Sequence, residues 1–269
     1  MTKIRVGELD VHVQRLPPVV APAEGRAPVV VLIHGMLYDS LASYYFTLGP
    51  KFAADGMDVV MYDLRGHGRT SRPATGYRLE QHVEDLDRLL DALEITEPVH
   101  LVGNSFGGSV AFGLAAARPE RVATITAIEA EPPVEGWRQR LGEGLAKAKP
   151  WLSEEETFEL ISQARGGHTA RLSRAAGKLL QATTIAEDVL VSRIIDAGLS
   201  ALKCPVLALY GDESVLMEQV DYLQSTLANC RVVVLPEQGH SVLIERTDEV
   251  SELIRDWVWE QSRVLVEAE

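Results

Sequence analysis

The chain has 269 residues, of which 46% are hydrophobic and 24% are charged, a composition typical of globular proteins and unlike that of disordered or fibrous ones. Its 39 acidic residues outnumber its 26 lysines and arginines, and the formal net charge of −13 argues against nucleic acid or an anionic membrane surface as a partner. The sequence contains no run of 18 apolar residues and no apolar leader, so we expect a cytoplasmic protein without a membrane partner.

Strand and helix patterns alternate over the first half of the chain. Continuous aliphatic runs, typical of strands buried on both faces, are followed by segments with helical periodicity. Strands are predicted at Val29–Ile33, Asp58–Tyr62, Val99–Val102 and Val122–Ile128, and helices at Leu41–Ala54, Leu79–Leu93 and Gly107–Arg118. This alternation predicts a parallel α/β sheet.

The pattern changes between residues 132 and 202, where no strand is predicted. Helical patterns cover Trp137–Lys149, Glu154–Arg165, Thr169–Ala182 and Ala186–Ala197. Strand and helix patterns then return at Val206–Tyr210, Met217–Leu227, Arg231–Leu235 and Val250–Trp259. We therefore predict a core of residues 1–131 and 203–269, interrupted by a helical cap of residues 132–202. Such a cap would lie over the carboxyl ends of the strands, where open α/β sheets bind ligands.

One segment carries a recognisable chemical pattern. The sequence HLVGNSFGG, from His100 to Gly108, runs from a predicted buried strand through G-x-S-x-G into a predicted helix. Gly103 and Gly107 allow a sharp turn that raises the Ser105 hydroxyl above the sheet. The start of the helix brings backbone N–H groups beside that hydroxyl. The pattern predicts Ser105 as a nucleophile.

Three further motifs follow predicted strands. His34-Gly35-Met36 follows the first buried strand, DLRGHGRTS begins at Asp63, and Gln238-Gly239-His240-Ser241 follows the last strand. Together with G-x-S-x-G, the order and spacing of these motifs resemble the α/β-hydrolase superfamily over nearly the whole chain. The resemblance implies a mostly parallel eight-stranded sheet flanked by helices, with an all-helical cap.

The resemblance also implies roles for individual residues. Ser105 would attack the substrate, and His240 would take its proton, because a serine hydroxyl needs an adjacent base. The backbone N–H groups of Met36 and Phe106 would form an oxyanion hole.

The acid that should orient His240 departs from the usual pattern. The position that carries an aspartate in most of the superfamily is Ser214 here. The first hypothesis is Glu129, 24 residues after Ser105, as in a branch of the haloalkane dehalogenases and near the aspartate of several carrier-protein thioesterases; Glu131 is its near substitute. The second hypothesis is Asp212 or its neighbour Glu213 with a shifted loop. The third is that the acid is missing and turnover is weak.

Apolar and aromatic residues in the insertion predict a largely apolar pocket. We expect Trp137 and Trp151 of the insertion, with Tyr38 after the HG turn, to contact a medium-sized apolar acyl substrate. The resemblance implies that this substrate would be an ester, thioester or lactone, either free or linked to a carrier protein or coenzyme A, and that it would be cleaved through an acyl-enzyme.

Two alternative functions remain open. The GNSFGG elbow also resembles hydrolases that cleave carbon–carbon bonds in diketone-type products of ring cleavage. A homologue that binds ligands with weakened catalysis is the alternative from another class. No metal or nucleotide motif is visible, so we expect no cofactor. The charge fits a monomer or a homodimer equally.

Overall fold

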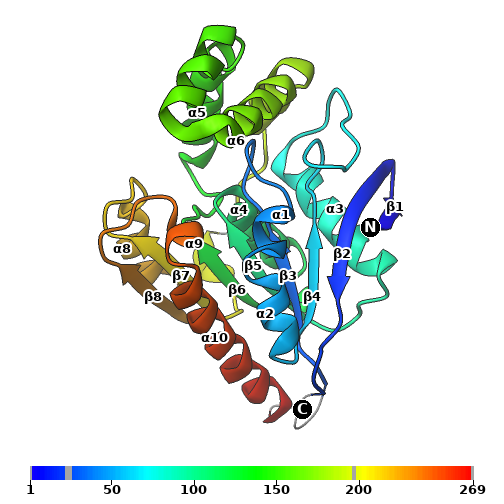
Figure 1. The fold of residues 1–269 in the computed structure, drawn as a ribbon. Coiled ribbons are helices and arrows are strands. Elements are labelled where there is room, and N and C mark those ends of the chain that lie inside the picture. The colour runs from blue at the N-terminus through cyan, green and yellow to red at the C-terminus, as the bar shows by residue number, and fades with distance from the viewer. Residues whose placement is uncertain (1, 22–25, 196–197, 268–269) are drawn as a thin grey trace.

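The computed structural model describes residues 2–21, 26–195 and 198–267. Eight strands form one sheet in the order β1-β2-β4-β3-β5-β6-β7-β8. β1 pairs antiparallel with β2 and β2 antiparallel with β4, whereas all other neighbours are parallel (Figure 1). The strands are β1 Thr2–Val6, β2 Leu9–Leu16, β3 Val29–Ile33, β4 Asp58–Tyr62, β5 Val99–Asn104, β6 Val122–Ile128, β7 Val206–Gly211 and β8 Cys230–Leu235. The predicted fold class is confirmed.

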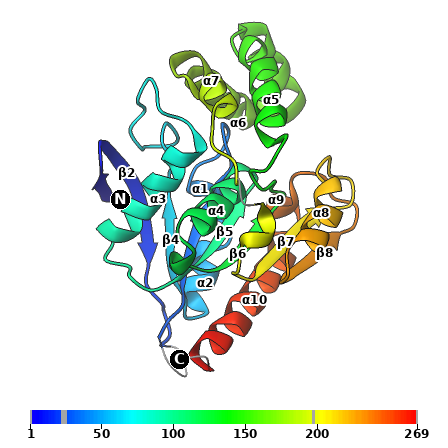
Figure 2. The ribbon, with the colours of Figure 1, turned by 180° about the vertical axis from the view of Figure 1, so that it is seen from behind.

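The central strands are buried because helices cover both faces of the sheet. Every residue of β3, β6 and β7 is buried, as expected for parallel strands with two covered faces. Figure 1 looks onto the face covered by α1 Ala42–Tyr45, α2 Gly49–Ala54, α9 Val242–Glu245 and α10 Thr247–Glu267. Figure 2 looks onto the opposite face, covered by α3 Leu79–Ala92, α4 Phe106–Ala117 and α8 Glu218–Thr226. Single 3-10 turns occupy Pro119–Arg121 and Leu199–Ala201.

Two predicted helices differ from the observed ones. The single helix expected at Leu41–Ala54 is divided into α1 and α2, because Pro50 lies in the first turn of α2 and lacks the N–H that a continuous helix would need. The helix expected at Ala186–Ala197 is shorter and forms α7 Ile185–Leu190; residues 196–197 of that prediction lie outside the described residues.

The remaining helices, α5 Trp137–Trp151 and α6 Glu155–Ala182, pack with α7 around a small hydrophobic cluster of their own. Gly166, with φ 86° and ψ 159°, breaks α6 between the two helices predicted there. The beginning and end of this segment lie together, because Ile195 N–H donates to Pro133 O at 2.8 Å. Figures 1 and 2 show the three helices beyond one edge of the sheet. Met36 and Leu37, which follow the carboxyl end of β3, pack against their cluster. The division into core and cap at residues 132 and 202 stays a prediction.

Among the helices within the described ranges, none combines the length and apolar character needed to cross a bilayer.

Candidate active site

The predicted nucleophile lies at a strained turn between β5 and α4. Ser105 separates the end of β5 from the start of α4 and has φ 52° and ψ −121°, a conformation that non-glycine residues rarely adopt. A Cβ atom on Gly103 would lie 2.4 Å from backbone atoms of Gly107 and Gly108, and one on Gly107 would lie 2.1 Å from Ile33 O. The two glycines are therefore required by the close approach of α4 to β3 and β5.

The register of the sheet brings Glu129 beside Ser105. Asn104 at the end of β5 pairs with Ile128 at the end of β6, so the next residue of each strand emerges at the same edge. Ser105 N–H donates to Ile128 O at 2.9 Å. Glu129 also has a positive φ, 47°, and its side chain is fully buried. Backbone strain of this kind is concentrated at functional sites, because the surrounding structure must hold it.

Both carboxylate oxygens of Glu129 accept hydrogen bonds. Gly211 N–H at the end of β7 donates to Oε1 at 2.6 Å, and Ser214 Oγ–H donates to Oε2 at 2.5 Å. His240 Nδ1–H donates to the same Oε2 at 3.0 Å. These donors offset the cost of burying a carboxylate. Ser214, which occupies the usual position of the acid, thus contacts an acid supplied by the neighbouring strand.

His240 connects this carboxylate to Ser105. It follows β8 in the loop before α9, and its Nε2 lies 3.3 Å from Ser105 Oγ. Because Nδ1–H donates to Glu129, Nε2 is left without a proton and can accept one from the serine hydroxyl. The His240 side chain is 49% exposed, so a substrate can reach the pair. This arrangement can activate the hydroxyl and stabilise the imidazolium that forms.

The other candidate acids lie elsewhere. Asp212 Oδ1 accepts a hydrogen bond from Gln238 N–H at 3.3 Å. Among the described residues, the exposed Glu213 forms neither a hydrogen bond nor an ion pair with His240. Glu131 forms an ion pair with Arg140. Of the carboxylates weighed from the sequence, the structure brings Glu129 alone to His240 within the described ranges.

The HG turn lies against the serine. A Cβ atom on Gly35 would be 3.5 Å from Ser105 Cβ, which places the predicted oxyanion donor Met36 one residue from the contact. Phe106, the second predicted donor, is the first residue of α4, where backbone N–H groups have no partner within the helix.

Two buried histidines hold this turn. His34 Nδ1–H donates to Gly35 O at 2.7 Å, and its Nε2 accepts from Leu64 N–H at 3.0 Å. His67 Nε2 accepts from Leu37 N–H at 2.9 Å. Burial lowers the pKa of both rings, that of His67 to about 3, so both stay neutral near neutral pH. Both rings therefore serve to hold the turn in place.

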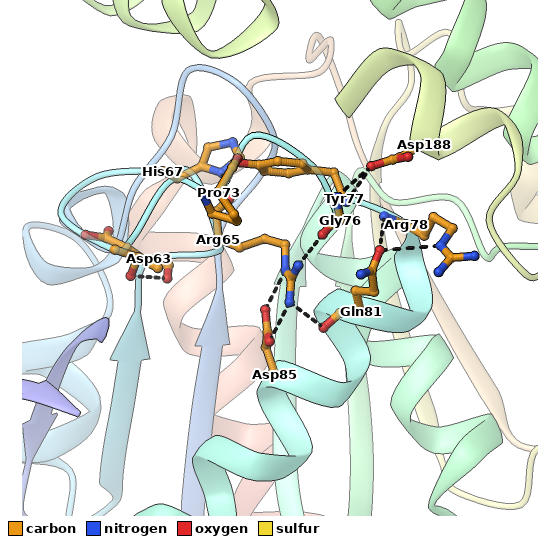
Figure 3. Close-up of polar contacts among 11 residues, drawn as sticks. Asp63, Arg65, His67, Pro73, Gly76, Tyr77, Arg78, Gln81, Asp85 and Asp188 are labelled. Carbon is orange, nitrogen blue, oxygen red and sulfur yellow. Dashed lines mark hydrogen bonds and ion pairs between the residues drawn. The ribbon is translucent and has the colours of Figure 1, made fainter. Parts of the chain in front are cut away.

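The loop that begins at Asp63 is tied to α3 and to the helical segment (Figure 3). Arg65 forms a two-point ion pair with Asp85 of α3, with both distances 2.7 Å, and it also donates to Gly76 O. Asp188 of α7 accepts from Gly76 N–H at 3.0 Å and from Tyr77 N–H at 2.8 Å. The buried Tyr77 ring packs into the cluster of α5–α7. These contacts fix the helical segment relative to the core.

A cavity of about 400 Å³ opens at Ser105, Glu129 and His240. Trp137, which we expected to contact the substrate, lines this cavity. Its ring stacks on Phe106 with centroids 6.3 Å apart, and its Nε1–H donates to Ser109 Oγ at 3.0 Å. Tyr38 and Trp151 do not line this cavity, and the two residues are 41% and 52% exposed. A larger cavity of about 780 Å³ lies beside α1 and α6 and does not include Ser105 or His240.

Three polar residues of the site were not predicted from the sequence to have a role there. The sequence shows Ser214 only as a departure from the usual pattern. A hydroxyl at the usual position of the acid could have indicated a hydrogen-bond donor to an acid supplied by another strand. Arg140 and Glu218 line the cavity from α5 and α8, and no local pattern links them. Across the described ranges, no group of three or more His, Cys, Asp or Glu residues is arranged to hold a metal ion.

The sequence of this chain is similar to those of several known proteins. A family model described as alpha/beta hydrolase fold matches residues 28–175, more than half of the chain. A non-heme chloroperoxidase of Streptomyces lividans is 39% identical over 31% of this chain and 30% of its own length. A haloalkane dehalogenase of Mesorhizobium japonicum is 38% identical over 43% of this chain and 36% of its own. A lipase of Mycobacterium tuberculosis is 36% identical over 49% of this chain and 46% of its own. The chain thus spans less than half the length of these relatives.

Solved structures show the same fold over almost the whole chain. An esterase of Exiguobacterium antarcticum superposes with a TM-score of 0.78 at 18% identity, covering 96% of this chain and 98% of its own. A thermophilic esterase of Thermogutta terrifontis superposes with a TM-score of 0.73 at 22% identity, covering 97% and 98%. The sheet order, the sharp turn at Ser105 and the family match lead to one conclusion: this chain belongs to the α/β-hydrolase family.

Proposed function

We propose that the protein is a serine hydrolase that cleaves an ester, thioester or lactone of a medium-sized acyl substrate through an acyl-enzyme on Ser105. The observation that carries the proposal is one chain of contacts: Ser105 Oγ lies 3.3 Å from His240 Nε2, and His240 Nδ1–H donates to Glu129 at 3.0 Å. The names of the similar lipase and esterases support ester chemistry in particular.

The proposed reaction has two halves. Ser105 Oγ attacks the carbonyl carbon while its proton moves to His240 Nε2, and the N–H groups of Met36 and Phe106 stabilise the negative oxygen. The tetrahedral intermediate collapses, His240 returns the proton to the leaving alkoxide or thiolate, and the acyl group stays on Ser105. Water then attacks the acyl-enzyme, with His240 as base, and releases the acid. Glu129 keeps its charge throughout and orients His240.

The helical segment of residues 132–202 is proposed to cap this site. Trp137 and Leu141 of α5 line the same cavity as Ser105, so substrate enters between α5 and the loop before α8. Burial of part of the substrate against α5 excludes water from the reacting carbonyl and strengthens the electrostatic contacts there.

The proposal is tested by the hydrolysis of matched 4-nitrophenyl esters, an aryl thioester and a lactone. We expect wild type to cleave at least one class, and Ser105→Ala to lose at least about 10³-fold in kcat, because the variant lacks the proposed nucleophilic hydroxyl. Ser225→Ala, an exposed serine on α8, is the matched control and should keep the wild-type rate. Hydrolysis that survives Ser105→Ala, or a folded wild type that cleaves none of the three classes, would contradict the proposal and favour a ligand-binding homologue.

A further inference from the structure

The cavity at Ser105 carries charged side chains that the proposed chemistry does not use. Glu131 follows β6, Arg140 projects from α5, and Glu218 begins α8; all three line the cavity together with the reacting residues. Leu141 and Leu216 contribute apolar surface to the same lining. The charges are therefore positioned to meet whatever group is attached to the reacting carbonyl.

Arg140, the one positively charged side chain of these three, already forms an ion pair. Arg140 donates from Nε to Glu131 Oε1 at 2.8 Å and from Nη2 to the same oxygen. Its Nη1 lies over Gly136, where a Cβ atom would be only 2.6 Å away. The hydrogen bond that Arg140 donates to Glu131 raises the pKa of Arg140, and the charge of Glu218 acts in the same direction. An incoming anion would have to displace a formed ion pair to reach this guanidinium.

The formal charges of the side chains that line the cavity add up to a negative value. The formal charges of Glu131 and Arg140 cancel, and that of Glu129 is matched by the proton that His240 gains during the reaction. The charges of the cavity lining then sum to one negative charge, equal to that of the exposed Glu218. An anionic group beside the carbonyl is repelled by this carboxylate, whereas a cationic group is attracted by it. The exposure of Glu218 limits the effect to that of a surface charge.

We propose that this site selects esters whose acyl or leaving group is uncharged or cationic and discriminates against anionic groups of the same size. The inference names the substrate class of the site proposed above and rests on that proposed function. The expected preference is about tenfold in kcat/KM for a cationic over an anionic substrate. This is the combined size of a modest surface attraction for the cation and a modest surface repulsion of the anion.

The kinetic test uses 4-nitrophenyl esters of three acids of similar length: a neutral alkanoate, a trimethylammonio-alkanoate and a dicarboxylate hemiester. The cation-to-anion ratio should fall towards one in Glu218→Gln, and it should rise in Arg140→Gln, which frees the charge of Glu131. Asp221→Asn, an exposed carboxylate on the same helix but outside the cavity lining, is the matched control and should leave the ratio unchanged. In 1 M salt the ratio should shrink in wild type, because exposed charges are screened. A ratio at or below one, or one that Glu218→Gln leaves unchanged, overturns the proposal.

A second measurement separates charge preference from catalysis. In Ser105→Ala, binding of phenyltrimethylammonium and of benzoate is measured by calorimetric titration, with no turnover required. The cation should bind about tenfold more tightly, and the added Glu218→Gln substitution should remove the difference. Equal affinities, or no binding of the cation, overturn the charge preference even where esters are cleaved. A cation preference in a protein that cleaves no ester overturns the proposed function alone.

Discussion

Replacing Glu129 by glutamine keeps its size and removes its charge. In the structure, Glu129 Oε1 accepts from Gly211 N–H, while Oε2 accepts from both Ser214 and His240. If the amide oxygen keeps the bond to Gly211, the amide NH₂ faces two donors. The imidazole then favours the tautomer with the proton on Nε2, which cannot accept the Ser105 proton.

The expected loss is about 10³–10⁴ in kcat with a small change in KM, equivalent to about 4–5.5 kcal/mol of transition-state stabilisation. The assay is steady-state hydrolysis of the best 4-nitrophenyl ester, with the thermal unfolding midpoint measured for each variant to confirm folding. Asp212→Asn is the comparison, since Asp212 contacts Gln238 and not His240; it should stay within about threefold of wild type. A large loss in Asp212→Asn beside near wild-type activity in Glu129→Gln would refute the reasoning.

Three further predictions concern the supports of the site. Ser214→Ala removes one donor to Glu129 and should lower kcat by about 10- to 100-fold without unfolding the protein, measured by the same assay; an unchanged kcat would contradict the positioning role. Gly103→Ala places a Cβ 2.4 Å from backbone atoms of α4 and should lower stability by several kcal/mol or abolish folding, measured by urea unfolding; a stable variant would contradict the close packing. Burial raises the pKa of Asp188, but hydrogen bonds from a threonine hydroxyl and two backbone amides hold it below its ordinary value of 3.8. Because the folded pKa is the lower one, this stabilisation is present above about pH 4 and lost as the pH falls through the folded pKa. Asp188→Asn should therefore cost about 1–2 kcal/mol at pH 7, and the deficit should shrink steadily as the pH is lowered below 3.8; a deficit that does not change with pH would contradict the assignment.

The strands could be predicted well because their signal is local. Val29–Ile33, Asp58–Tyr62 and Val122–Ile128 were expected and found with the same bounds, since a parallel strand covered on both faces must be a continuous apolar run. The helix expected at Leu41–Ala54 was less accurate. Its apolar spacing continues across Pro50, but the backbone cannot, and the chain starts a new helix there.

Ser105 could be identified from the sequence because the turn that holds it is built from adjacent residues. The choice between Glu129 and Asp212 could not be made in the same way. Both follow neighbouring parallel strands and emerge at the same edge of the sheet, so strand order alone allows either. The outcome depends on side-chain direction, which is set by the positive φ of Glu129 and by the donors from Gly211 and Ser214.

The lining of the cavity was the least predictable part. Arg140 and Glu218 lie far apart in the sequence and come together only because α5 and α8 border the same opening. Tyr38 and Trp151 are aromatic and close to predicted site segments, yet proximity in sequence says nothing about which way a loop or helix-end side chain points. Both were expected at the substrate, and neither lines the cavity.

The central claim is that His240 and Glu129 activate Ser105 for nucleophilic attack, and a fluorophosphonate probe tests it most directly. The protein would be labelled at neutral pH, digested, and the phosphonylated residue identified by mass spectrometry. The account predicts one rapidly formed adduct on Ser105, which is absent in Ser105→Ala and formed far more slowly in Glu129→Gln. A folded wild type that is not labelled, or an adduct on a different residue, would contradict it.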